Sequence, residues 1–130
     1  MDLTELLSSM PFALANGVEL TSASVDEVVG TLSWSTERCT AGGVLHGGAL
    51  MTLADSLGAI LAFLNLPEGA KATSTIESKT NLFRAVRDGA VTGTATLLHG
   101  GRSTIVVQTD LRDDAGRRVA LTIQTQSVLR

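Results

Sequence analysis

The sequence predicts an α+β protein in which one long buried helix packs against one face of a six-stranded antiparallel sheet. Residues 47–64 form an apolar segment with helical periodicity and a single charged side chain, Asp55. Four segments of alternating polarity follow this helix, separated by short turns, and two strand-like segments precede it. A length of 130 residues is enough for one hydrophobic core, so we expect a single domain over residues 1–130.

The helix over residues 47–64 is predicted from its large apolar residues, which recur at i, i+3, i+4 and i+7. These residues are Leu50, Leu53, Leu57, Ile60, Leu61 and Leu64. Asp55 lies nearly opposite this stripe, because each residue turns the helix by about 100°. The neighbours expected on that outer side are Met51, Thr52, Gly58, Ala59 and Ala62. A helix with so little outer charge is expected to bury both sides, the outer one against a second copy of the chain.

The other elements are predicted from period-two alternation and from turn residues. A short helix over residues 2–9, ended by Pro11, precedes strands over 18–25 and 28–34, and a loop over 35–45 leads into the long helix. The later strands are expected over residues 72–86, 91–98, 103–111 and 118–129, with turns at 87–89, 99–101 and 113–116. Consecutive strands joined by short turns indicate an antiparallel meander.

Composition excludes several classes of function. A net charge of −3 gives no reason to expect nucleic-acid or membrane-surface binding, and 3% aromatic residues argue against a base-stacking platform. The single Cys39 fits a reducing compartment, and acidic residues stand where a secretory signal needs positive charge, so we expect a cytoplasmic protein. The spacing of His, Cys and acidic residues suggests no metal site, and no cofactor is expected.

The motif His46-Gly47-Gly48 at the start of the predicted helix indicates where chemistry takes place. Amide N–H groups at a helix start lack intrahelical partners, and the helix dipole adds positive potential, so a carbonyl placed there would be polarised. A carboxylate in an apolar segment is costly unless it is paired or used, which makes Asp55 a candidate general base or nucleophile. Two helical turns separate Gly47 from Asp55, so we expect a partner subunit to supply the carboxylate.

The element order ββαββββ, the His-Gly-Gly turn and an acid nine residues after His46 resemble the hotdog-fold acyl-CoA thioesterases of the PaaI-like and 4-hydroxybenzoyl-CoA thioesterase families. The resemblance covers residues 18–128. It implies a sheet wrapped around the central helix and assembly as a homodimer or a dimer of dimers. It also implies hydrolysis of an aryl or short- to medium-chain acyl-CoA to a free acid and CoA.

The resemblance also assigns site residues position by position. The catalytic carboxylate falls on Asp55 and the polarising amide on Gly47, while His46 is expected to orient the loop or the helix start. Further polar positions fall on Thr40, where some members carry Asn, and on Ser74, or Thr73 if the alignment shifts. In one branch of the family, a Thr lies one helical turn after the catalytic acid, and Ala59 occupies that position in this sequence. The CoA contacts fall on Gly48, Arg84, Arg102, Ser103 and Thr104.

Two other functions stay open on the same fold. One is an acyl-CoA or acyl-carrier-protein hydratase or dehydratase, although such enzymes pair a catalytic His with an acid and His46 stands in the thioesterase arrangement. The other is a non-catalytic acyl-CoA-binding module, which Thr40 and Ala59 favour because both replace polar helpers.

Overall fold

The computed structural model describes residues 2–130 and confirms the predicted order of the strands and of the long helix. Two short helices, α1 (Leu3–Ser8) and α2 (Pro11–Ala15), open the chain. They are followed by β1 (Val18–Ala23), β2 (Glu27–Ser33), the 3₁₀ turn η1 (Thr36–Arg38) and α3 (Gly47–Leu64). The chain ends with β3 (Ala72–Leu82), β4 (Ala90–Gly100), β5 (Thr104–Arg112) and β6 (Arg118–Leu129).

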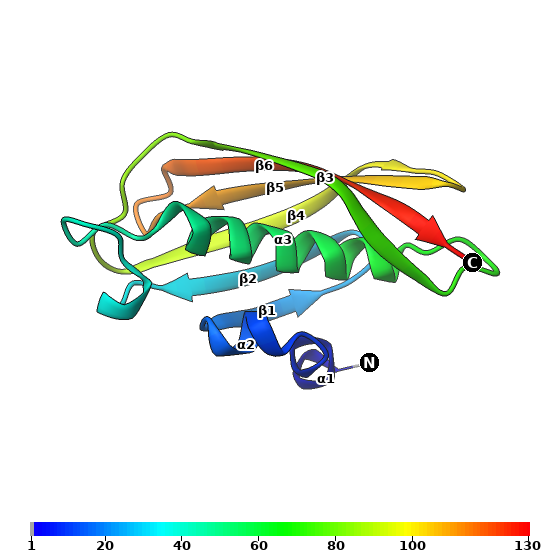
Figure 1. Ribbon diagram of the computed structural model, residues 1–130, viewed down its shortest axis with the longest axis horizontal. Helices are drawn as coiled ribbons and strands as arrows, with labels where there is room; N and C mark the ends of the chain where they lie inside the picture. Colours follow the sequence, from blue (N-terminus) through cyan, green and yellow to red (C-terminus); the bar gives the residue numbers. More distant parts are fainter. Residues whose placement is uncertain (1) are drawn as a thin grey trace.

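The six strands form one antiparallel sheet in the order β1-β2-β4-β5-β6-β3, and α3 lies across one face of it (Figure 1). The helices α1 and α2 lie beside the β1 edge, and β3 forms the opposite edge. This arrangement confirms the predicted hotdog fold. One side of α3 therefore packs on the sheet, and its other side lies between the N-terminal helices and β3.

The core lies between α3 and the sheet. Leu53, Leu57 and Leu61 of α3 are fully buried, together with side chains such as Val28 and Val91 from the strands. Each buried side chain of this kind contributes about 1.5–3 kcal/mol through removal of apolar surface from water. α3 is also the one helix within residues 2–130 long and apolar enough to cross a membrane, a test that the core helix of a soluble protein also meets.

The prediction of which α3 residues lie on its outer side is partly wrong. Gly58 and Ala62 are buried, and a Cβ atom on Gly58 would collide with the side chain of Gln124 from β6. The exposed residues of α3 are Met51, Asp55 and Phe63, one or two helical turns apart. The outer side is therefore a narrower strip than the sequence suggested, and it has Asp55 near its middle.

The N-terminal prediction is also corrected. Pro11 starts α2 instead of only ending the first helix, because proline at the first helical position has a suitable φ and needs no N–H partner. α1 begins after Asp2, whose carboxylate accepts a hydrogen bond from the Glu5 N–H at 2.8 Å. Both helices pack against β1, and α2 also contacts α3, which brings the N-terminal segment to the outer side of α3.

Several strand ends differ from the prediction. β1 ends at Ala23 instead of residue 25, because the chain turns there and the Ser24 N–H donates to Glu27 O at 2.9 Å. β3 ends at Leu82 instead of residue 86, because its partner β6 begins at Arg118 and the backbone N–H groups of Phe83 and Arg84 both donate to Val119 O. β4 extends to Gly100 instead of ending at residue 98, because a bulge at Leu97–His99 keeps the strand paired with β5. The predicted turn at 99–101 is therefore shifted towards residues 101–103.

Candidate active site

The start of α3 is fixed by His46, which is the N-cap residue. Its Nδ1 atom accepts a hydrogen bond from the Gly48 N–H at 2.8 Å, and its carbonyl oxygen accepts from the Ala49 N–H at 2.8 Å. The His46 N–H in turn donates to Arg38 O at 2.8 Å. Through these contacts His46 orients the start of the helix, as expected. The Gly48 N–H, which was expected to contact CoA, is already used in the hydrogen bond to His46.

The Gly47 N–H differs from its neighbours because no group within residues 2–130 accepts a hydrogen bond from it. Gly47 lines a depression of about 300 Å³ together with Leu82, Phe83 and Arg84 from the end of β3. A Cβ atom at Gly47 would approach Leu82 Cδ1 to 2.8 Å, so only glycine keeps this depression open without moving that side chain. The depression thus offers one free amide donor at the positive end of a helix dipole.

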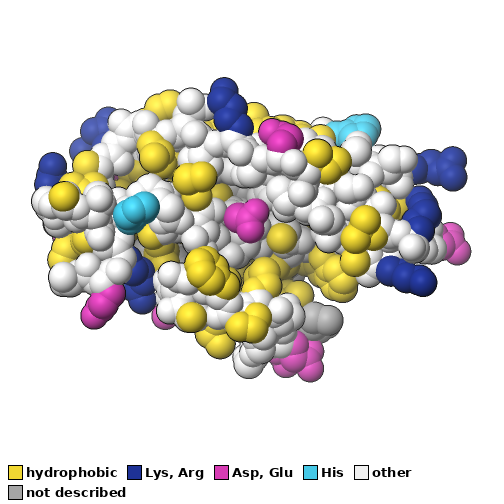
Figure 2. All heavy atoms as spheres, in the orientation of Figure 1, with side chains coloured by type: hydrophobic (Ala, Val, Ile, Leu, Met, Phe, Trp, Pro, Cys, Tyr) yellow, Lys and Arg dark blue, Asp and Glu magenta, His cyan; other side chains and the backbone are white. Residues whose placement is uncertain are grey.

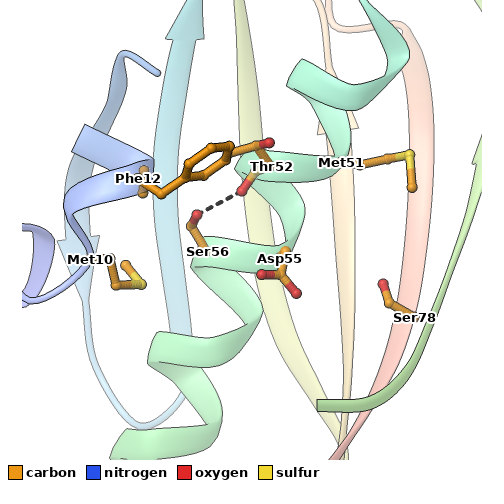
Figure 3. A pocket seen from close by; sticks show the side chains of 8 residues that line it. Met10, Phe12, Met51, Thr52, Asp55, Ser56 and Ser78 are labelled. Atoms are coloured by element: carbon orange, nitrogen blue, oxygen red, sulfur yellow. Dashed lines mark hydrogen bonds between the residues drawn. The ribbon is translucent and has the colours of Figure 1, made fainter. Parts of the chain in front are cut away.

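Asp55 lines a separate cleft of about 410 Å³ on the outer side of α3. Met10 and Phe12 form the wall on the side of α2, and Ser78 of β3 lies across the cleft (Figure 3). No side chain or N–H group of residues 2–130 donates a hydrogen bond to the Asp55 carboxylate, and no cation pairs with it. Partial burial raises the pKa of Asp55 above its ordinary value. An unpaired carboxylate of raised pKa is suited to accept a proton.

The hydroxyl groups in the Asp55 cleft are not equivalent. Thr52 Oγ1 donates to Gly48 O at 2.8 Å, and Ser56 Oγ donates to Thr52 O at 2.7 Å, so both protons are used within α3 (Figure 3). The Ser78 hydroxyl has no hydrogen-bond partner within residues 2–130. Ser78 is therefore the strand hydroxyl available in this cleft, and the sequence did not single it out.

Ser74, the strand hydroxyl that the sequence did single out, is not in the Asp55 cleft. A bulge at Thr75–Glu77 shifts the pairing of β3 with β6, so Ser74 pairs with Ser127 whereas Ser78 pairs with Gln124. Gln124 faces α3, because its side-chain amide donates to Ala54 O at 3.3 Å. Alternation along β6 then places Ser127 and Ser74 on the opposite face of the sheet, and it leaves Thr73 on the helix side. The bulge thus places Ser78 on the helix side of β3, whereas Ser74 was assigned from the family resemblance and not from the alternation of the strand.

The expected CoA contacts lie at two ends of the molecule. Arg84 is next to Gly47, beyond the end of β3, whereas Arg102 lies in the turn after β4, where its carbonyl accepts a hydrogen bond from Arg130 Nη2 at 3.0 Å. The 11 residues of β3 lie between these two places and span on the order of 35 Å. Figure 2 shows most of the Lys and Arg side chains on this face towards the two ends of the long axis.

The remaining predicted residues lie away from the Asp55 cleft. Ser103 and Thr104 follow Arg102 at the start of β5, where the Ser103 carbonyl accepts from the Val128 N–H at 2.9 Å. Thr40 is exposed in the loop before α3, and its N–H donates to Val44 O at 2.8 Å. The structure thus brings Gly47 together with Arg84, and Asp55 together with Ser78, in separate depressions of one protomer. Within residues 2–130 no group of three or more His, Cys, Asp or Glu side chains is placed to hold a metal ion.

Comparison with known proteins identifies the family to which this fold and site belong. Residues 42–120 match the profile of the thioesterase superfamily, a segment that includes the His-Gly-Gly turn, α3 and strands β3, β4 and β5. The chain belongs to this superfamily, as the sequence predicted.

Individual relatives agree with this assignment. A Vibrio cholerae protein named as a candidate esterase is 42% identical over 88 residues, which are 68% of this chain and 58% of that protein. The crystal structure of a thioesterase from Haemophilus influenzae superposes with a TM-score of 0.92 and 30% identity, over 100% of this chain and 92% of that one. A thioesterase structure with coenzyme A, from Streptococcus pneumoniae, has a TM-score of 0.83 at 25% identity, over 94% and 95% of the two chains.

Proposed function

We propose that this protein hydrolyses an acyl-CoA thioester to a free acid and CoA, in a site that combines Asp55 of one subunit with the Gly47 N–H of its partner. The observation that carries the proposal is that these are two unpaired polar groups, a raised-pKa carboxylate and a helix-start amide, in separate depressions of one protomer. Family membership and the Streptococcus pneumoniae thioesterase with coenzyme A support the substrate class.

The roles of the two groups follow from their chemistry. The Gly47 N–H donates a hydrogen bond to the thioester carbonyl and stabilises the oxyanion that develops on it. Asp55 accepts a proton from a water molecule as the water oxygen attacks the carbonyl carbon. The C–S bond then breaks, and the sulfur of CoA leaves as a thiolate that takes up the proton accepted by Asp55. In the alternative route, Asp55 attacks the carbon itself and water hydrolyses the resulting anhydride.

A dimer is supported by the surface along β3 and the outer side of α3. β3 is an 11-residue edge strand, with Ile76 61% exposed at its middle and Phe83 exposed just beyond its end. Met51 on α3, which shares a depression with Ser78 of β3, adds an exposed apolar side chain beside this strand. The side chains of β3 are mostly polar, but a long edge strand leaves a row of backbone N–H and C=O groups that can pair with another chain. Antiparallel pairing of β3 with its copy covers this surface and gives a 12-stranded sheet from two copies of the six strands.

The same pairing brings the two basic ends together. In an antiparallel pair, the end of β3 near Arg84 meets the beginning of the partner strand, which lies next to Arg102 and Arg130 of the partner subunit. The phosphate groups of CoA then have guanidinium groups from both subunits within reach, although the chain as a whole carries a net charge of −3. Arg84 lies next to Gly47, so the thioester and the CoA phosphates are bound at neighbouring places.

The proposal is tested by measuring CoA thiol release from a panel of acyl-CoA thioesters with the wild type and with Asp55→Asn. We expect turnover by the wild type and a fall in kcat of roughly 10²- to 10⁴-fold in the variant, the usual range for a general base. Asp88→Asn is the matched control, since Asp88 is an exposed turn residue away from the Asp55 cleft.

Other outcomes identify the other functions. Hydration of an enoyl-CoA without thiol release would show a hydratase. Binding of acyl-CoA without turnover would show a non-catalytic module. Unchanged turnover in Asp55→Asn would exclude Asp55 as base or nucleophile.

A further inference from the structure

A second depression lies next to the Asp55 cleft along the outer side of α3. It has a volume of about 260 Å³ and is lined by Leu6, Ser9, Met10, Ala59, Ile60 and Phe63. Met10 lines this depression and also the Asp55 cleft, so its side chain is the common wall between them. Asp55 and Ala59 are four residues apart on α3 and so lie one turn apart on the same side of the helix. We call this depression the apolar chamber.

Among the residues that the structure describes, the walls of the apolar chamber carry no charge and offer no free hydrogen-bond donor. Its one polar side chain is Ser9, and the Ser9 hydroxyl already donates to Leu6 O at 2.6 Å. A ligand group that needs hydrogen bonds, such as a ring hydroxyl, would lose its water partners here without replacement. A purely hydrocarbon group loses nothing and gains from burial. The chemistry of the walls therefore selects hydrocarbon groups over hydroxylated ones, and the distance of one helical turn from Asp55, about 5.4 Å, favours an extended alkyl chain over a ring joined directly to the carbonyl.

We propose that the apolar chamber binds the acyl chain of the substrate, and that the preferred substrates are CoA thioesters of unbranched acyl chains with about six to eight carbons. This inference rests on the proposed function. It follows from continuity with the Asp55 cleft, because a chain whose carbonyl lies beside Asp55 reaches the chamber past Met10. A methylene occupies about as much space as a water molecule, roughly 30 Å³, so a chamber of about 260 Å³ holds at most about eight methylenes, which sets the upper limit of the chain length.

Met10 and Ala59 determine the length of chain that fits. Ala59 is the smallest side chain on the α3 wall, so a larger residue there fills the chamber while the helix is retained, since Leu is nearly as favourable in helices as Ala. Met10 is flexible and unbranched, and it adapts its position to the chain that passes it. Replacing Met10 with a smaller residue joins the Asp55 cleft to the apolar chamber and makes room for a longer acyl chain.

The test is a chain-length series of acetyl-, butyryl-, hexanoyl-, octanoyl- and dodecanoyl-CoA, with benzoyl-CoA as an aryl substrate. For the wild type we expect kcat/KM to rise by roughly fourfold for each methylene buried, up to about eight carbons. Ala59→Leu should lower kcat/KM for octanoyl-CoA by roughly tenfold or more and change that for acetyl-CoA less than about twofold. Met10→Ala should move the optimum to longer chains.

The control is Ala115→Leu, which adds the same side chain at an exposed turn far from both depressions. Hydrolysis of none of these thioesters would overturn the proposed function and this inference together. Hydrolysis with a flat chain-length profile, or with benzoyl-CoA preferred, would overturn the chamber alone. An equal loss at every chain length in Ala59→Leu, with no shift of the optimum in Met10→Ala, would also overturn it.

Discussion

Asp55 and the Gly47 N–H share one property at the scale of single residues, because each is a polar group without a partner among residues 2–130. Polar groups in folded proteins are usually paired when they are removed from water, whereas Asp55 is exposed and Gly47 half-buried in the single protomer, so a ligand or a partner subunit can reach both. The neighbouring groups show the usual pattern, since His46 caps Gly48 and the Thr52 and Ser56 hydroxyls donate to helix carbonyls. The two unpaired groups therefore mark the reactive part of the site.

The charge of Asp55 should reduce stability in a pH-dependent way. Burial raises the pKa of Asp55 in the folded protein, so folding favours the protonated carboxyl. The penalty is absent below the pKa of an unfolded Asp, about 3.9, and it is fully present above the raised folded-state pKa.

Comparing the free energy of unfolding of the wild type and Asp55→Asn by urea titration checks this expectation. At pH 7 the variant should be as stable as the wild type or more stable. As the pH falls from above the raised pKa of Asp55 to below the unfolded value, the free energy of unfolding of the wild type should increase relative to that of the variant. The carboxylates of Asp110 and Asp113, whose pKa values are lowered, affect both proteins equally. A variant less stable than the wild type at neutral pH would show that Asp55 is structural.

The role of the Gly47 N–H can be tested by a substitution that removes this N–H group. Gly47→Pro removes the N–H at the first helical position, where proline is well tolerated, and His46 before it has φ −62° and ψ 135°, which proline accepts. We expect kcat to fall by about 10²- to 10³-fold, the usual loss for one oxyanion donor. Gly47→Ala is the control, because it makes the same approach to Leu82 and keeps the N–H. Equal activities of the two variants would contradict the role.

At the scale of elements, α3 was predictable to the residue, whereas the faces of β3 were not. The α3 boundaries come from the His-Gly-Gly start and the apolar spacing up to Leu64, both of which are local signals. The face that a residue of β3 presents depends on the bulge at Thr75–Glu77, which no glycine or proline marks. No local signal therefore pointed to Ser78, whereas Ser74 was assigned from the family resemblance.

The outer side of α3 shows a second limit of periodicity. Helical periodicity predicted Gly58 on the outer side, because a small residue fits a buried or an exposed position equally well. In the structure the Gln124 side chain reaches across from β6 and fills the space beside Gly58. Gln124 is itself fully buried and accepts a hydrogen bond from Gln126 Nε2 at 2.8 Å. A buried pair of amides under a helix is not visible in an alternating strand pattern.

Gly58 should therefore be intolerant of alanine although it lies inside a helix. In an open helix the change would stabilise by about 0.5–1 kcal/mol. Here the added methyl collides with the buried Gln124 side chain, so we expect a net loss of about 1–3 kcal/mol in the free energy of unfolding, measured by denaturant titration. The double variant Gly58→Ala/Gln124→Ala should recover part of the loss. An increase in stability for Gly58→Ala alone would show that Gln124 moves away at little cost.

At the scale of the whole molecule, each protomer supplies two half-sites. Gly47 and Arg84 form one half, and Asp55, Ser78 and the apolar chamber form the other. Joined across a two-fold axis, the first half holds the thioester carbonyl and CoA while the second supplies the carboxylate and receives the acyl chain. The two helical turns between Gly47 and Asp55 already indicated that these residues belong to different half-sites. Arg84 and Arg102, however, were predicted as neighbouring CoA contacts, whereas they lie at opposite ends of the protomer.

We expect at least a dimer in solution, and the β3 edge should hold it together. Light scattering at micromolar concentration should give at least twice the mass of one chain. Ile76→Lys places a charge on the exposed bulge of β3 and should promote dissociation together with loss of CoA release. Val25→Lys is the control, because Val25 is similarly exposed, at 56%, but lies in the turn between β1 and β2. A stable wild-type monomer would contradict the shared site.

The central claim is that Asp55 acts on a thioester held by the partner's Gly47, and complementation tests it most directly. Asp55→Asn and Gly47→Pro are each expected to be nearly inactive alone. When the two chains are co-expressed in equal amounts, about half of the dimers are mixed, and each mixed dimer has one site in which both groups are intact. The account predicts CoA release at about one quarter of the wild-type rate per chain. Activity that stays at the level of the single variants would contradict it and place both groups of each site in one subunit.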